Sequence, residues 1–167
     1  MENKSEKQHT GLKWLKVYNE ELGKIKDVSP LLLVLCVSAG IEFIGKLLST
    51  DDIDNGNKCN IKFEDALGKF ASLKKYESKD FYHLVRCGLA HRIGVKEGII
   101  LSPSQESDLE SKPIRLNTNQ FYKDFSQAVE DAQTSSLIVN PIATLPYISV
   151  NEFSETGSTI TILEYLQ

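Results

Sequence analysis

Arg86 and His91, an arginine and a histidine separated by four residues, are the pair in this sequence best suited to chemistry on a phosphate. Histidine titrates near neutral pH, so His91 can serve as a general acid or base. Arginine keeps its charge at any working pH, and its planar guanidinium can bind a phosphate through two hydrogen bonds. The spacing therefore combines a proton-transfer group with an anion clamp.

The pair requires a helix to hold it, and the surrounding residues predict one that begins at a cap at Ser78 or Asp80 and ends near Gly94. At about 100° per residue, one face of this helix is apolar and the opposite stripe is small in the middle and polar at its edges. Small residues allow close approach, so the same stripe of a second copy can pack here across a two-fold axis. The apolar face comprises Phe81, Val85, Gly88 and Leu89, and the stripe comprises His83, Cys87, Ala90 and His91, with Arg86 at its border.

Further residues are candidates to support this pair. Glu42 lies four residues before Lys46 on an apolar helix, and a carboxylate there needs a partner. Either Glu42 pairs with Lys46 on the helix surface, or it reaches across the bundle to orient Arg86 or a histidine. His83 is a supporting site candidate, and Tyr82 is placed where it can stack on a base.

Metal binding is the alternative for the series His83, Cys87 and His91, in which adjacent pairs can each hold an ion. All three cannot hold one ion, because the ends lie about 12 Å apart along a helix. Cys87 is expected to be a small interface residue rather than a nucleophile. We expect neither a metal nor another cofactor.

The rest of the chain predicts a mainly α fold, a four- to five-helix bundle with a small β hairpin after the fourth helix. The bundle forms a single domain over residues 1–167, with a helical core at about 11–133 and a C-terminal extension at about 134–167. The second helix is apolar nearly all round, so it should lie centrally, with Ser29 as its N-cap. The expected helices are Gly11–Lys26, Pro30–Ser49, about Phe63–Tyr76, the helix of Arg86, and Thr118 or Asn119 to about Gln133, and the expected strands are Val95–Leu101 and Pro113–Asn117.

Composition limits the function classes. The 167 residues carry 19 Lys and Arg against 23 Asp and Glu, a net charge of −4, which disfavours non-specific coating of nucleic acid but allows one focused site. The three cysteines are widely and unequally spaced, which indicates a reducing cytoplasm. The apolar run Leu31–Leu48 contains Glu42 and Lys46, which favours a buried helix over a membrane span.

The motif Arg86-x4-His91 near the end of a late helix in such a bundle resembles the HEPN superfamily. Many members of that superfamily are metal-independent endoribonucleases that act as toxins or in phage defence and form dimers with the two motifs facing each other. The resemblance implies that a homodimer cleaves RNA by attack of the 2′-hydroxyl, with His91 as general acid/base and Arg86 as phosphate clamp. It also implies an antitoxin or nucleotidyltransferase as a further partner.

Cys87 departs from the pattern of the active members, in which the residue after the arginine is commonly polar. The alternative function is therefore a non-catalytic helical module of the same ancestry that binds RNA or a protein.

Overall fold

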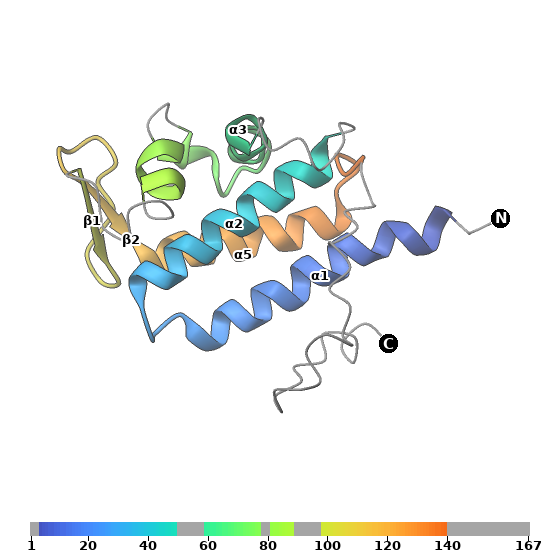
Figure 1. The fold of residues 1–167 in the computed structure, drawn as a ribbon, viewed down its shortest axis with the longest axis horizontal. Helices are drawn as coiled ribbons and strands as arrows, with labels where there is room; N and C mark the ends of the chain where they lie inside the picture. The colour runs from blue at the N-terminus through green and yellow to red at the C-terminus, as the bar shows by residue number, and fades with distance from the viewer. Residues whose placement is uncertain (1–3, 50–58, 78–80, 89–97, 140–167) are drawn as a thin grey trace, which may run out of the picture.

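The computed structural model describes residues 4–49, 59–77, 81–88 and 98–139, and this part of the chain is mainly helical with a small sheet (Figure 1). This confirms the predicted mainly α class. The elements are α1 (Lys4–Ile25), α2 (Pro30–Leu48), α3 (Cys59–Lys69), the 3₁₀ turn η2 (Lys74–Tyr76), the π-helical segment η3 (Tyr82–Cys87), β1 (Ile99–Ser102), β2 (Ile114–Asn117) and α5 (Thr118–Thr134).

Helix α2 is the central element, as predicted. The Ser29 hydroxyl accepts a hydrogen bond from the Leu32 N–H, and Pro30 occupies the first turn, where its missing N–H costs nothing. α2 packs against α1, α3 and α5, and Figure 1 shows α1, α2 and α5 side by side with α3 across α2. α2 is long and apolar enough to cross a membrane, but 61% of that stretch is buried inside the protein.

Two glycines of α2 let its neighbours approach closely. A Cβ added at Gly40 would lie 2.4 Å from the Phe125 ring of α5, and one at Gly45 would lie 1.8 Å from the backbone oxygen of Lys62 in α3. Because a side chain at either position would force its neighbour to shift, the Phe125 ring and the α3 backbone both pack directly on the α2 backbone. The contact at Gly45 places the start of α3 beside the second half of α2.

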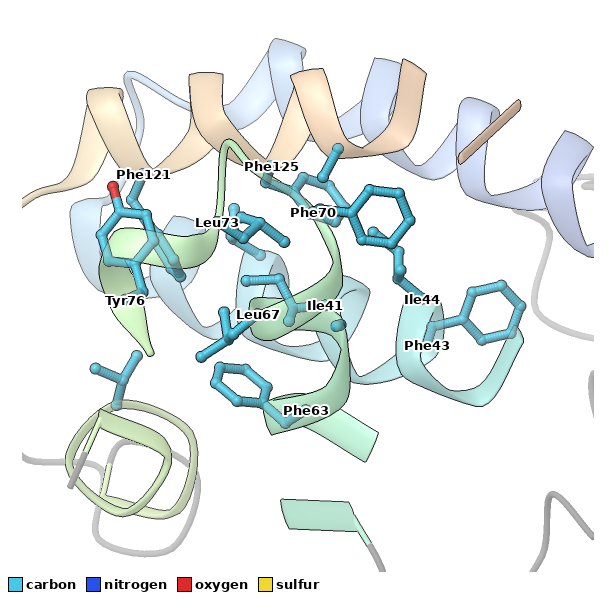
Figure 2. Close-up of a cluster of buried hydrophobic side chains, with 14 of the residues drawn as sticks. Ile41, Phe43, Ile44, Phe63, Leu67, Phe70, Leu73, Tyr76, Phe121 and Phe125 are labelled. Carbon is cyan, nitrogen blue, oxygen red and sulfur yellow. The ribbon is translucent and has the colours of Figure 1, made fainter. Parts of the chain in front are cut away.

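The core lies between α2, α3, α5 and the η2 turn, and Figure 2 shows its aromatic and aliphatic side chains. Tyr76 of η2 packs against Phe81, and both rings contact Phe121 of α5. Phe63 of α3 packs against Phe81 as well. The predicted core residues of α5 are all buried, namely Phe121, Phe125, Ala128 and Val129.

The two strands pair in parallel, from Ile99 opposite Ile114 to Ser102 opposite Asn117. The predicted hairpin, which requires antiparallel strands, is therefore wrong. Residues 103–113 form a connection long enough to carry the chain back to the beginning of β1, whereas hairpin loops are usually two to five residues. Within this connection, Asp108 forms an antiparallel bridge with Arg115 of β2.

Several helix boundaries differ from those expected. α5 is capped by Asn117, whose side chain accepts from the Gln120 N–H, rather than by Thr118 or Asn119. α3 begins at Cys59 and ends at Lys69, after which 3₁₀-type hydrogen bonds replace the predicted continuation to Tyr76. The predicted fourth helix is described only over residues 81–88, where it is π-helical, and residues 89–97 lie outside the described part.

Candidate active site

A buried carboxylate, Glu42, joins two cations at the surface of α2. Its Oε2 accepts a hydrogen bond from Arg86 Nε at 3.1 Å, and its Oε1 lies 3.7 Å from Lys46 Nζ. Only 8% of the Glu42 side chain is exposed, against 30% for Arg86 and 26% for Lys46. One negative and two positive charges give the cluster a net charge of +1 in an acidic protein.

The sequence predicted one of two partners for Glu42, either Lys46 on the helix surface or Arg86 or a histidine across the bundle. Both occur in the structure, because the two oxygens of one carboxylate serve different partners. The Arg86 contact is shorter and hydrogen-bonded, so it is the one that fixes geometry. The Lys46 contact is longer, at 3.7 Å, so it constrains the direction of the carboxylate less.

The orientation of Arg86 suits anion binding. Glu42 engages Nε at one corner of the guanidinium, and the planar group carries two further amino groups that can bind a phosphate. The charge of Arg86 also reaches its surroundings. Burial raises the pKa of the Tyr18 hydroxyl, as does the nearby thiol of Cys36, and the positive charge of Arg86 partly opposes that rise.

Cys59, the first residue of α3, lies beside Glu42 and was not anticipated from the sequence. Burial raises the pKa of its thiol, and the neighbouring Glu42 carboxylate raises it further, against the opposing charges of Lys46 and Arg86. The sequence placed the start of this helix near Phe63, so nothing in its periodicity brought Cys59 to the site. The sequence feature that could have indicated this contact is Gly45, which lets α3 pack directly on α2.

The π-helical turn η3 sets the direction of Arg86. A π-helix joins residues five apart, and such turns occur frequently at functional sites. The same spacing brings the Tyr82 hydroxyl to the Cys87 thiol; burial raises the pKa of Tyr82, and Cys87 adds to the rise. The predicted apolar face is confirmed for Phe81, Val85 and Gly88, which are buried.

Tyr82 does not stand ready to stack on a base, as the sequence suggested. The side chain is buried, and its ring packs edge-on against Phe63 of α3 with 5.3 Å between ring centroids. The prediction assumed α-helical steps of about 100°, which a π-helical turn does not follow. The large ring is therefore used in the core, between η3 and α3.

The two histidines are placed differently. His83 is exposed, and its ring packs against that of Tyr82 at 5.5 Å. Among the contacts of the described residues, none joins His83 to Glu42 or Arg86. His91, the predicted acid/base, lies outside the described residues, as does Ala90. In the described part of the chain, no group of three potential ligands is arranged to hold a metal.

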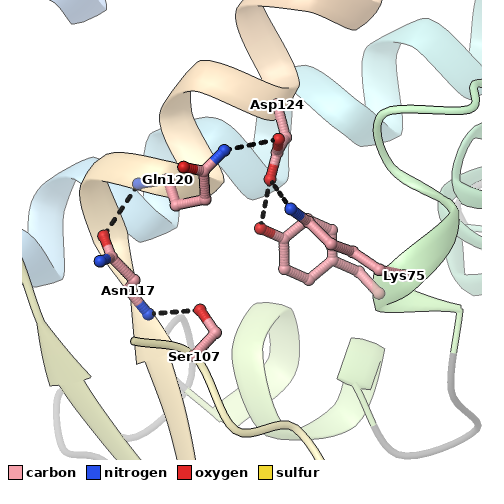
Figure 3. Close-up of polar contacts among 6 residues, drawn as sticks. Lys75, Ser107, Asn117, Gln120 and Asp124 are labelled. Carbon is pink, nitrogen blue, oxygen red and sulfur yellow. Dashed lines mark hydrogen bonds and ion pairs between the residues drawn. The ribbon is translucent and has the colours of Figure 1, made fainter. Parts of the chain in front are cut away.

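A second polar cluster, also unanticipated, surrounds Asp124 of α5 (Figure 3). Its carboxylate accepts hydrogen bonds from the Tyr76 hydroxyl at 2.6 Å and from Gln120 at 2.9 Å, and it lies 2.7 Å from Lys75 Nζ. This cluster ties η2 to α5. Because Tyr76 also packs against Phe81, the cluster supports the start of the segment that carries Arg86.

Comparison with known proteins gives no relative: no family model, no curated protein and no solved structure matches the chain. The class that the structure itself defines is a mainly helical protein in which a buried glutamate orients a half-exposed arginine.

Proposed function

We propose that this protein is a metal-independent endoribonuclease with Arg86 and His91 as its catalytic residues. The observation that carries the proposal is the Glu42–Arg86 hydrogen bond at 3.1 Å, which fixes the direction of a side chain suited to binding phosphate. The net charge of +1 in the Glu42 cluster supports an anionic substrate at a focused site. RNA is proposed as the substrate because the Arg86-x4-His91 motif resembles that of the HEPN superfamily.

In the proposed reaction, the neutral His91 imidazole takes the proton of the ribose 2′-hydroxyl, and the 2′-oxygen attacks the adjacent phosphorus. The bond to the 5′-oxygen breaks, and that oxygen takes a proton from a protonated imidazole, which leaves a 2′,3′-cyclic phosphate. The guanidinium of Arg86 stabilises the non-bridging oxygens as negative charge builds on them. Glu42 is a positioning residue that acts through Arg86.

The proposal includes a homodimer, because one Arg–His pair from each subunit would provide both a base and an acid. An antitoxin or nucleotidyltransferase partner, a role in toxin–antitoxin or phage defence, and a cytoplasmic location belong to the same proposal. The three cysteines are free thiols, as a reducing compartment requires.

The test is RNA cleavage by the purified protein in the presence of EDTA, with product ends analysed by mass spectrometry. We expect cyclic phosphate ends from the wild type and a loss of at least about 100-fold in R86A and H91A. The matched control is R115A, because Arg115 is also half-exposed and paired with a carboxylate, Asp108, but lies on β2.

Unchanged cleavage in R86A or H91A would show that the assignment is wrong. RNA binding without cleavage, weakened by R86A but not by R115A, would favour the non-catalytic module. Cleavage that disappears with EDTA would favour a metal-dependent site.

A further inference from the structure

Lys46 is the cation of the Glu42 cluster that has no part in the proposed reaction. Its Nζ lies 3.7 Å from Glu42 Oε1, which is beyond the range of an N–H···O hydrogen bond. Glu42 binds Arg86 through Nε, and among the described residues no hydrogen bond engages the Lys46 ammonium or the other two nitrogens of Arg86. These donors therefore remain for an acceptor that arrives from solvent.

The positive charges of the cluster are its accessible charges. The Glu42 side chain is only 8% exposed, whereas the side chains of Lys46 and Arg86 are 26% and 30% exposed. One carboxylate holds both cations, so an anion on the free side of the Arg86 guanidinium is within reach of the flexible Lys46 side chain. An anion from solvent thus meets two cations before it meets the carboxylate.

The neighbouring titratable groups do not cancel this positive charge. Burial raises the pKa of the Cys59 thiol, and the Glu42 carboxylate raises it further. Burial and the Cys87 thiol raise the pKa of the Tyr82 hydroxyl above its ordinary value of about 10. Both groups are consequently protonated and neutral at pH 7.

We propose that Lys46 is a second phosphate-binding residue, which contacts the same phosphodiester as Arg86. The inference rests on the proposed function, because it adds a substrate-binding residue to that site. Arg86 binds one non-bridging oxygen, and the Lys46 ammonium turns from Glu42 Oε1 to the other. That movement breaks no hydrogen bond, and Glu42 keeps its hydrogen bond to Arg86 throughout. The substrate is then held between α2 and η3.

Two purely structural roles are the alternatives for Lys46. It lies in the last turn of α2, where a cation interacts favourably with the helix dipole, and it lies one turn after Glu42, where it forms an i,i+4 pair. Both roles contribute to stability alone. Measuring phosphate binding and stability on the same variants therefore separates them from the proposal.

Lys75 provides a matched control, because it is also a lysine beside a largely buried carboxylate. Its Nζ lies 2.7 Å from Asp124 Oδ2, and the Asp124 side chain is 12% exposed. The same carboxylate accepts hydrogen bonds from Tyr76 and Gln120, so this cluster has no excess positive charge. K75M removes one positive charge from the protein without altering the Glu42 cluster.

The experiment measures the binding of a 2′-O-methyl RNA dinucleotide by NMR titration of the full chain. This probe has a single phosphodiester and no free 2′-hydroxyl, so it is not cleaved and both cations must act on one phosphate. We expect the dissociation constant to rise about 10-fold in K46M and at least as much in R86A, since each change removes a charge-assisted hydrogen bond. K46R and K75M should remain within about 2-fold of the wild type. Urea unfolding establishes that each variant is folded.

The methylphosphonate analogue of the dinucleotide, whose linkage is uncharged, tests the cause of the loss. The wild type and K46M should bind this analogue with equal affinity, because the charge that Lys46 contacts is absent. A difference that persists with the analogue would overturn the inference, since Lys46 would then act on another part of the nucleotide.

Equal dissociation constants for the wild type and K46M also overturn the inference, as does a wild type that does not bind the dinucleotide. An equal loss in K46M and K75M would overturn it in favour of an effect of net charge alone. Binding that depends on both Lys46 and Arg86, in a protein that leaves RNA intact, supports the shared phosphate contact while the proposed function fails. RNA cleavage that R86A abolishes, with kcat and KM unchanged in K46M, supports the proposed function while the Lys46 contact fails.

Discussion

The hydrogen bond from Tyr76 to Asp124 predicts how stability changes with pH. Tyr76 is fully buried, and its hydroxyl lies 2.6 Å from the Asp124 carboxylate. Burial raises the pKa of this tyrosine well above its ordinary value of about 10, and the hydrogen bond to Asp124 and the negative charge of that carboxylate raise it further. Above pH 10 the unfolded chain therefore loses the tyrosine proton while the folded protein retains it.

The perturbation is Tyr76→Phe, which removes one oxygen and leaves Asp124 with Lys75 and Gln120 as partners. At pH 7 we expect the free energy of unfolding to fall by about 2 kcal/mol, since a buried hydrogen bond to a charged group contributes about 1.5–3 kcal/mol. At pH 11 ionisation of Tyr76 in the unfolded chain lowers the free energy of unfolding of the wild type by about 1.4 kcal/mol. The variant has no hydroxyl at this position, so it does not lose that amount. The gap between the two proteins should then narrow to about 0.6 kcal/mol.

Urea unfolding followed by the fluorescence of Trp14, the only tryptophan, measures both proteins between pH 7 and pH 11. The comparison variant Tyr122→Phe removes the hydroxyl of a half-buried tyrosine of α5, which donates to the Asn19 carbonyl at 3.1 Å. A gap for Tyr76→Phe that stays near 2 kcal/mol up to pH 11 would refute the reasoning about proton retention. Equal stability at pH 7 would refute the reasoning about the hydrogen bond.

Three further predictions concern the neighbours of the candidate site. Gly45→Ala should lower the free energy of unfolding by at least about 2 kcal/mol, because the new Cβ meets a backbone oxygen of α3 at 1.8 Å. Gly68→Ala, whose Cβ meets only a flexible side chain at 3.3 Å, should change it by less than about 1 kcal/mol; urea unfolding separates the two. Alkylation of Cys59, followed by peptide mass spectrometry at pH 8, should accelerate in Glu42→Gln, since the carboxylate raises the pKa of the thiol; an unchanged rate would place Glu42 too far away to act. The double variant Glu42→Leu/Arg86→Met should be more stable than Glu42→Leu alone, because the single change leaves a half-buried arginine unpaired; additive effects in a double-mutant cycle would contradict the pairing.

Local sequence signals predicted the parts of the fold that local interactions determine. Ser29 and Pro30 mark the start of α2 because a cap and a first-turn proline act within one turn. The apolar face of α5 followed from its spacing, and its residues are buried as expected. The central place of α2 followed from the lack of a polar face.

Tertiary contacts decided what the sequence could not show. The parallel pairing of β1 and β2 depends on the path of residues 103–113, which no periodicity reveals. The π-helical turn at Tyr82–Cys87 changed the directions of its side chains, so Tyr82 is in the core. Cys59 and Asp124 joined polar clusters through contacts between distant elements, and short-range patterns carry no such information.

The burial of Glu42 is itself an argument about function. An ion pair removed from water is weak evidence for stability, because a well-packed apolar side chain at the same place is often as good or better. On a helix as apolar as α2, a leucine at position 42 would extend the surrounding surface without a desolvation cost. What the carboxylate supplies instead is direction: it holds Arg86 Nε at 3.1 Å and leaves the guanidinium half-exposed. A cation fixed in that way is suited to binding an anion, which is the role that the proposed ribonuclease requires of it.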